Sequence, residues 1–180
     1  MLTKKELGIT SGVGTGWSNI PACYDKSDTT KATVVSGQGQ ELSLAVDTSN
    51  IEDIQSVSTA TLKITSSCWH VENNFFDVST NVSSTVIGKV PISTTKSTYT
   101  LDITEVVKSN QLSTLKLRPY ASSAVYETTV ELYEVGIEVV IEDGTGVNTL
   151  HLGDVSVDKV FLGNDVVDSI YLGDTLVYGK

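Results

Sequence analysis

Apolar and polar residues alternate in short runs between residues 42 and 141, and this pattern constrains the fold more than any other feature of the chain. Successive side chains of a β-strand point to opposite faces, so alternation predicts strands with one buried face and one solvated face. Turns rich in Ser, Thr, Asn and Gly separate the runs. The apolar members are Leu42, Leu44 and Val46; Ala60, Leu62 and Ile64; Tyr99, Leu101 and Ile103; Leu115 and Leu117; and Val130, Leu132, Val135, Ile137, Val139 and Ile141.

Seven or eight short strands with this spacing are typical of a sandwich, and we predict an all-β protein with a jelly-roll-like β-sandwich over residues 32–142. The parity of the alternation changes between Leu132 and Val135, which predicts a bulge or bend in the final strand. "DITEVVKS" predicts one short helix, with Thr104 or Asp102 as its cap. Residues 1–31 contain "SGVGTGW", with three glycines in six residues, and we expect an extended or flexible arm there.

The chain ends on a ten-residue sequence that is repeated three times: "TLHLGDVSVD" (149–158), "KVFLGNDVVD" (159–168) and "SIYLGDTLVY" (169–178). Gly followed by Asp or Asn between apolar residues favours a two-residue turn, so each copy is predicted to form a β-hairpin. The expected cross-strand pairs are Leu150 with Val157, Val160 with Val167, and Ile170 with Val177. Residues 143–148, which begin "DGTG", are predicted to be a hinge between the sandwich and the repeats.

The repeat module predicts a contact with other proteins. A single hairpin is barely stable in water, and the seam that three copies share is thin. Phe161, Tyr171 and Tyr178 would leave an exposed apolar patch unless the sandwich or another subunit covered them, and such patches mark contacts. We interpret these three residues as an assembly contact. The alternative is a β-extension that packs on its own domain.

Composition excludes several classes of partner. The net charge of −10 repels the phosphates of nucleic acids and the headgroups of anionic membranes. No run approaches the roughly 20 apolar residues of a membrane span, and the N-terminus lacks the features of a signal peptide, so we expect folding in the cytosol. Cys23 and Cys68 lack zinc-site spacing and are expected to be free buried thiols, with a disulfide as the alternative.

No cofactor, metal or catalytic motif is predicted. The aspartates of "LGD" suit a turn, which leaves calcium as the less favoured reading of the repeats. There is no GxSxG or HExxH, and a Cys68–His70 pair has no third group to support it, so we expect a protein that is not an enzyme.

"CWHVENNFFD" (68–77) is unusually rich in aromatic and amide side chains. Aromatic rings stack on sugars and amides hydrogen-bond to them, so Trp69, Asn73 and Asn74 are candidate glycan contacts. A core strand with its turn, or a subunit interface, is the favoured alternative for this stretch.

The "LGD" decapeptide repeat resembles C-terminal segments of bacteriophage virion proteins, especially those of phages with Gram-positive hosts. "STATLKIT" (58–65), "STYTLDITEVV" (97–107) and "LYEVGIEVVIE" (132–142) resemble the jelly-roll, galactose-binding-like modules of phage tail, fibre and capsid-accessory proteins. The resemblance implies a structural virion protein, such as a capsid decoration, head-fibre or tail-associated subunit. It would form homo-oligomers, bind other virion proteins, and be synthesised in the host bacterial cytoplasm. The alternative is a carbohydrate-binding module for adhesion to host surface glycans.

Overall fold

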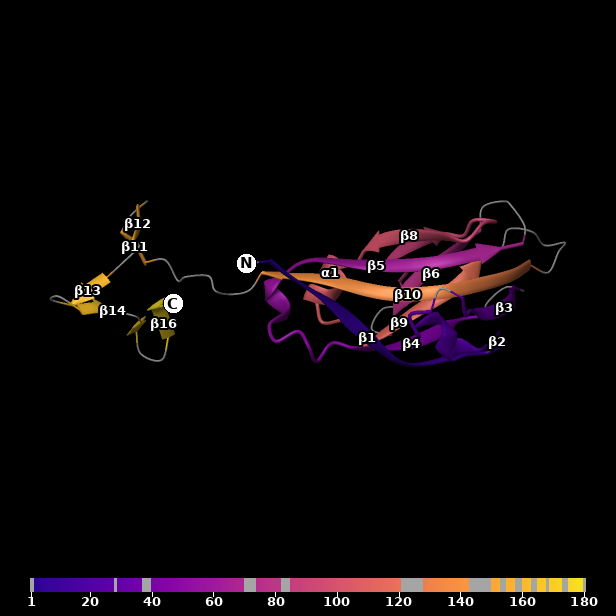
Figure 1. Cartoon of the computed structure of the whole chain (residues 1–180), viewed down its shortest axis with the longest axis horizontal. Coiled ribbons are helices and arrows are strands. Elements are labelled where there is room, and N and C mark those ends of the chain that lie inside the picture. Colours follow the sequence, from indigo (N-terminus) through magenta and orange to yellow (C-terminus); the bar gives the residue numbers. More distant parts are fainter. Residues whose placement is uncertain are drawn as a thin grey trace. The chain divides into compact units, whose positions relative to one another are not determined.

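A computed structural model describes residues 2–27, 29–36, 40–69, 74–81, 85–120 and 128–142, together with the backbone of six short strands between residues 150 and 179 (Figure 1). The chain divides into two compact units. One comprises Lys4–Ile141, and the other comprises Met1–Thr3 with Glu142–Lys180.

The first unit is a β-sandwich, which confirms the predicted all-β fold. Its strands are β1 (Leu2–Gly14), β2 (Trp17–Ser18), β3 (Ala32–Ser36), β4 (Leu42–Asp47), β5 (Val57–Cys68), β6 (Phe75–Thr80), β7 (Gly88–Pro91), β8 (Ser97–Asp102), β9 (Thr114–Tyr120) and β10 (Thr128–Glu142). Two 3₁₀ helices, η1 (Ile20–Cys23) and η2 (Ile54–Ser56), and one α-helix, α1 (Thr104–Lys108), connect them.

Two five-stranded antiparallel layers form the sandwich. One layer has the order β2-β3-β10-β5-β8, and the other has the order β1-β4-β9-β6-β7. The two layers are joined because β1 also pairs with β10. β5 and β9 finish, and β6 and β10 begin, at the same end of the sandwich. We call this the distal end. The start of β1 and the finish of β10 lie at the opposite end (Figure 1).

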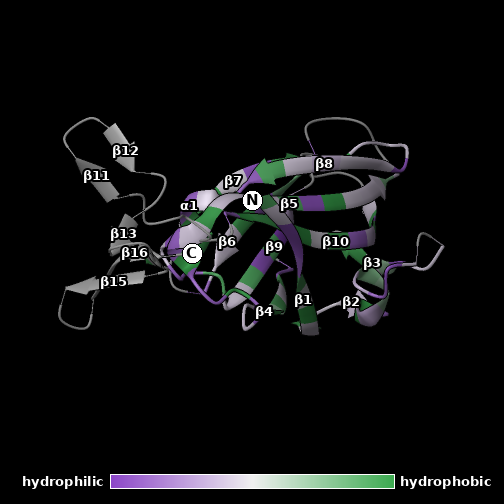
Figure 2. Ribbon diagram, turned by 60° about the vertical axis from the view of Figure 1, so that its left-hand side comes forward, coloured by the Kyte–Doolittle hydropathy of each residue, from purple (hydrophilic) through white to green (hydrophobic). Residues whose placement is uncertain are grey.

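Alternation along the strands builds the core between the two layers. Hydrophobic and hydrophilic residues alternate along β5 and β10 (Figure 2). Most core-facing side chains are buried, whereas Tyr99 and Leu101 of β8 are partly buried. The largest fully buried side chains on the strands are Phe76, Leu42, Leu44, Leu62, Ile64, Leu115, Leu117, Leu132 and Ile137. Burial of apolar surface on one face of each strand is therefore the main favourable contribution to folding.

The predicted irregularity of the last strand is confirmed. Leu132 pairs with Ser66 and Glu134 pairs with Thr65, so Tyr133 is an extra residue in β10. The predicted helix is confirmed as α1, but its N-cap residue is Ile103, which makes no side-chain cap hydrogen bond, and not Thr104 or Asp102. Asp102 Oδ1 accepts hydrogen bonds from the backbone N–H of Thr104 (2.9 Å) and from its hydroxyl (2.6 Å) at the start of this helix.

The N-terminal segment differs from the expected arm, because it forms a paired strand of the sandwich. β1 pairs with β10, and from Gly8 to Gly14 it pairs with β4. The glycines that suggested flexibility serve packing and a turn instead. A Cβ on Gly12 would lie 2.5 Å from Ile20 Cγ2, and Gly16 has a φ of 78° in the turn that leads to β2. β1 and β2 raise the number of described sandwich strands to ten, above the seven or eight expected.

Three separate hairpins follow in the second unit: β11–β12 (Leu150–Leu152, Val155–Val157), β13–β14 (Val160–Leu162, Asp165–Val167) and β15–β16 (Ser169–Leu172, Thr175–Gly179). The first two have the predicted pairs, Leu150 with Val157 and Val160 with Val167. The third keeps the predicted register next to its turn, where Tyr171 pairs with Leu176, but its register shifts by one residue beyond that pair, so Ile170 pairs with Tyr178 and not with Val177. The predicted hinge at 143–148 and the turn residues lie outside the described residues.

No helix in the described part of the chain is long and apolar enough to cross a membrane.

Deleting residues 1–14 tests the role of β1. We expect loss of the cooperative unfolding transition in thermal circular dichroism. The stability lost with a strand that lies between β10 and β4 should exceed a typical folding free energy of about 5–15 kcal/mol. Deletion of residues 143–180, outside the sandwich unit, is the control and should leave a cooperative transition. A cooperative transition in the protein that lacks residues 1–14 would contradict the integral role of β1.

Candidate functional site

Trp69 is the most exposed large apolar side chain in the described part of the chain. It follows β5 at the distal end and is 85% exposed, whereas the neighbouring Cys68 is buried. The alternation of β5 ends here, since Ser66, Ser67 and Cys68 are all buried. An indole ring that is exposed to solvent offers a flat apolar surface to a ligand.

The two asparagines predicted beside Trp69 have different outcomes. Asn74 is only 9% exposed, and its Nδ2 donates a hydrogen bond to Cys68 Sγ at 3.1 Å. Its side chain therefore helps to fix the start of β6 from inside and is not presented to a surface ligand. Asn73 and His70 lie outside the described residues.

The aromatic residues of the predicted assembly contact lie on strands. Phe161 is in β13, Tyr171 in β15 and Tyr178 in β16. Their side chains are outside the described part of the structure, so the assembly contact stays a prediction.

A second aromatic group lies at the distal end, on β6 and β9. The rings of Phe75 and Tyr120 stack with centroids 5.1 Å apart, and Lys89 Nζ lies 4.0 Å from the centroid of Phe75. Phe75 thus has a neighbour on each face, and the partner ring Tyr120 is the exposed member of the pair. Phe75 belongs to the aromatic-rich stretch "CWHVENNFFD", but its partner Tyr120 was not predicted, because it comes from a strand 45 residues later.

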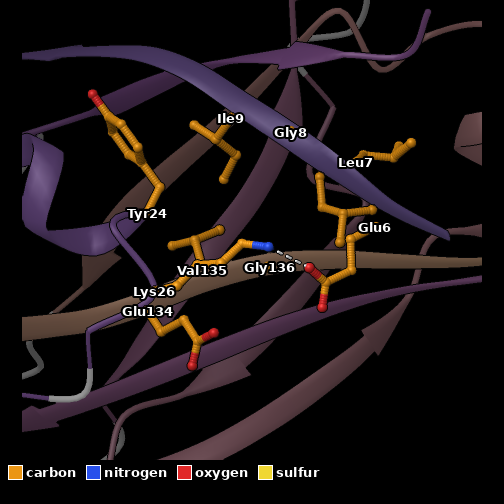
Figure 3. Close-up of a pocket in the computed structure, with 10 residues that line it drawn as sticks. Glu6, Leu7, Gly8, Ile9, Tyr24, Lys26, Glu134, Val135 and Gly136 are labelled. Atoms are coloured by element: carbon orange, nitrogen blue, oxygen red, sulfur yellow. Dashed lines mark hydrogen bonds and ion pairs between the residues drawn. The ribbon is translucent and has the colours of Figure 1, made fainter. Parts of the chain in front are cut away.

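A pocket of about 190 Å³ lies on the sandwich surface between β1, the segment after η1, and β10 (Figure 3). We call it the fork pocket. Its lining residues are Glu6, Leu7, Gly8 and Ile9 of β1, Tyr24 and Lys26 of the segment after η1, and Glu134, Val135, Gly136 and Ile137 of β10.

A second hollow of about 250 Å³ adjoins the fork pocket, because the two share Glu6, Glu134, Gly136 and Ile137. The second hollow extends over the outer face of the sheet to Lys63, Thr65, Thr98 and Glu138. Gly136 lies at the junction, and a Cβ added there would meet no atom within 4 Å. The floor at this point is therefore bare backbone of β10.

Ion pairs surround Gly136. Lys26 Nζ lies 2.6 Å from Glu6 Oε2, which connects the two sides of the fork pocket (Figure 3). Glu138 pairs with Lys63 (3.0 Å) and Lys4 (3.3 Å). The hydrogen bond to Glu6 raises the pKa of Lys26, and the hydrogen bonds from Lys63 and Lys4 lower the pKa of Glu138. Glu134 makes no ion pair within the described residues.

These groups suit binding by hydrogen bonds. A general acid must hold a proton near neutral pH, and the lowered pKa of Glu138 keeps this carboxylate ionised. In the described part of the chain, no three His, Cys, Asp or Glu side chains are grouped so that they could hold a metal ion. The carboxylates accept hydrogen bonds, and the ammonium and hydroxyl groups donate them.

The fork pocket was not predicted from the sequence. Its residues come from β1, the segment after η1, and β10, which are brought together only by the long-range pairing of β1 with β10. One local signal was present: a single glycine in the middle of "LYEVGIEVVIE", where glycine weakens a strand.

The cysteines are as predicted. Cys23 and Cys68 are both buried, and they are not joined to each other by a disulfide. Burial raises the pKa of the Cys23 thiol to about 12, so this thiol remains protonated and is a poor nucleophile.

Comparisons with known proteins support the fold. No family model matches the chain, and no curated protein matches it. A solved structure described as truncated AlyQ with CBM32 and alginate lyase domains matches with a TM-score of 0.50 and 13% sequence identity. The match covers 83% of this chain and 40% of that chain. The two chains share a β-sandwich fold. At this identity the likeness extends to the fold alone.

The ion pairs of Glu138 predict acid sensitivity. Because the folded-state pKa of Glu138 is lowered from 4.5, its contribution to stability is present above pH 4.5 and is lost as the pH falls through the folded-state pKa. In Glu138→Gln, the melting temperature should therefore fall less steeply with acidification than in the unaltered protein. Glu52→Gln, which removes an exposed carboxylate outside these pairs, is the control. If the melting temperature fell equally steeply with pH in all three proteins, the ion pairs of Glu138 would not be the source of the acid sensitivity.

Proposed function

We propose that this protein is a non-enzymatic carbohydrate-binding module that attaches to glycans through the distal end of its sandwich. The observation that carries the proposal is the exposure of Trp69 on an otherwise well-buried scaffold. An indole face covers the C–H face of a sugar ring without requiring a fixed pattern of hydroxyl groups. Binding sites of this kind need a rigid support, and β5 provides it through paired neighbours on both edges.

The fold comparison is consistent with this role. AlyQ contains a CBM32 domain, and its chain shares the sandwich fold. The described part of the sandwich also lacks a grouped set of metal-ligating side chains, which suits binding by stacking and hydrogen bonds.

Trp69→Ala tests the proposal. We expect glycan affinity to fall by about 2 kcal/mol, or roughly 30-fold, because tryptophan at a binding hot spot contributes on this scale. The free energy of unfolding should change by less than about 0.5 kcal/mol, since the side chain is exposed. Affinity is measured on a glycan array followed by calorimetric titration, and stability by urea unfolding.

Val13→Ala is the matched control, because Val13 is also an exposed apolar residue (69%), on β1. It should leave both affinity and stability unchanged. If Trp69→Ala destabilises the sandwich as much as a core substitution does, or leaves glycan affinity intact, the proposed role of Trp69 is wrong.

A second candidate function is assembly into a virion, with the repeat module as the contact. The specific observation is that the three hairpins fall in a compact unit of their own, and each pairs only within itself among the described residues. Two-stranded hairpins are marginal alone, so a surface that covers them would stabilise the module. In this hypothesis the protein forms homo-oligomers on a phage capsid or tail after synthesis in the bacterial cytoplasm.

Deletion of residues 143–180 tests this second function. We expect the truncated protein to remain folded but to become monomeric and to be absent from particles. Sedimentation velocity measures the oligomeric state, and mass spectrometry of purified particles measures incorporation. A truncated protein that assembles like the full chain would refute a role of the hairpins in assembly.

A further inference from the structure

We propose that the fork pocket and the adjoining hollow at Gly136 form a second saccharide-binding site, which takes one neutral sugar unit directly onto the backbone of β10. This inference rests on the proposed carbohydrate binding and adds a place for it that is separate from Trp69. It follows from two residues: Gly136, whose residue type is unfavourable inside a strand, and Lys26, whose backbone conformation is unfavourable for lysine.

Gly136 is the first of these residues. It lies in the middle of the 15-residue strand β10, paired with Lys63 of β5. Its φ is outside the left-handed region, and a Cβ would meet no atom within 4 Å. A Cβ therefore has room at this position, and β-branched residues would strengthen the strand. Glycine in a strand without a steric reason marks close approach of a ligand or another backbone.

Lys26 is the second. Three described residues other than glycine have positive φ, namely Asn19, Lys26 and Asn110. Asparagine tolerates this conformation, whereas lysine lacks the short polar side chain that relieves it. The conformation (φ 59°) accompanies a side chain that reaches the fork pocket and pairs with Glu6. The pair is solvent-exposed on both sides and contributes little to stability, so it does not offset the backbone strain.

The chemistry of the walls indicates a neutral, hydroxyl-rich ligand. Three carboxylates (Glu6, Glu134 and Glu138) and two ammonium groups (Lys26 and Lys63) line the two hollows, so the site does not attract anions. Sugar hydroxyls both donate and accept hydrogen bonds, and they can therefore bind to either kind of group. Tyr24, Ile9 and Val135 supply an apolar wall for the C–H face of the ring.

The size of the site limits the ligand to a small unit. Each hollow by itself, at about 190 and 250 Å³, is smaller than the ~300–1,000 Å³ of pockets that enclose drug-sized molecules. A single sugar ring, free or within a longer glycan, matches this space better than an extended ligand does.

The test is a titration of the full-length, ¹⁵N-labelled protein with D-galactose, D-glucose and N-acetyl-D-glucosamine, and with D-glucuronate as the charged comparison. We expect at least one neutral sugar to shift the backbone amides of Gly136 and Lys26 in a saturable way. Gly136→Thr should abolish these shifts without lowering the melting temperature, because Thr fills the floor of the site and suits a strand. Val140→Thr, which adds the same side chain to the same strand outside the two hollows, should retain them.

Lys26→Gly is the second variant. Glycine adopts the left-handed conformation without strain, so we expect an equal or higher melting temperature. The substitution also removes one wall of the site, so the sugar affinity measured from the Gly136 amide shift should fall at least tenfold. It provides the same test if Gly136→Thr does not fold.

The outcomes separate this inference from the proposed function. Sugar-induced shifts at the Trp69 indole N–H alone would overturn the second site and leave the proposed function standing. Shifts at neither place would overturn both. Shifts at Gly136 with D-glucuronate only, or shifts that persist unchanged in Gly136→Thr, would also overturn the second site.

Discussion

The pairing of β1 with both β10 and β4 is the constraint on which the rest of the sandwich depends. A sandwich needs its two layers held at a fixed spacing around a core, and here one continuous strand belongs to both layers. Its register along β4 shifts between Ile9 and Ser11. Because β10 and β4 belong to different layers, β1 leaves one ladder as it joins the other, and a hollow lies between β1 and β10. The fork pocket is therefore a consequence of how the layers are joined.

Much of the architecture was predictable because its signals are local. Alternation identifies which residues of β4, β5, β9 and β10 face the core, and the change of parity locates the extra residue Tyr133. Gly followed by Asp or Asn predicted the register of two hairpins from ten residues each. The N-terminal segment was misjudged because glycine has two different uses. Gly12 permits close packing against Ile20, and that use cannot be distinguished from flexibility without knowing which segment lies opposite.

The candidate sites were less predictable for the same reason. Trp69 was noticed through composition, but its exposure depends on where β5 ends relative to the neighbouring strands. From the sequence, Asn74 was as good a candidate for a glycan contact as Asn73, yet its side-chain amide is buried and donates a hydrogen bond to the Cys68 sulfur atom. The fork pocket combines residues that are more than a hundred positions apart, and neither Glu6 nor Lys26 belongs to any motif. Only Gly136 stands out within its own segment.

The spacing of the two proposed sugar contacts determines what kind of glycan could use them together. Cys68, beside Trp69, and Lys63, opposite Gly136, are five residues apart on β5, a distance of about 17 Å along the strand. The hydroxyl groups of Thr65 and Thr98, 2.8 Å apart, lie on the outer face between them. A monosaccharide can occupy one contact at a time. A glycan of several sugar units that followed the outer face of β5 could reach both, and its second contact would then form at the high effective concentration set by the first. Two weak contacts on one rigid sheet can therefore produce selectivity for chain length that neither contact provides alone.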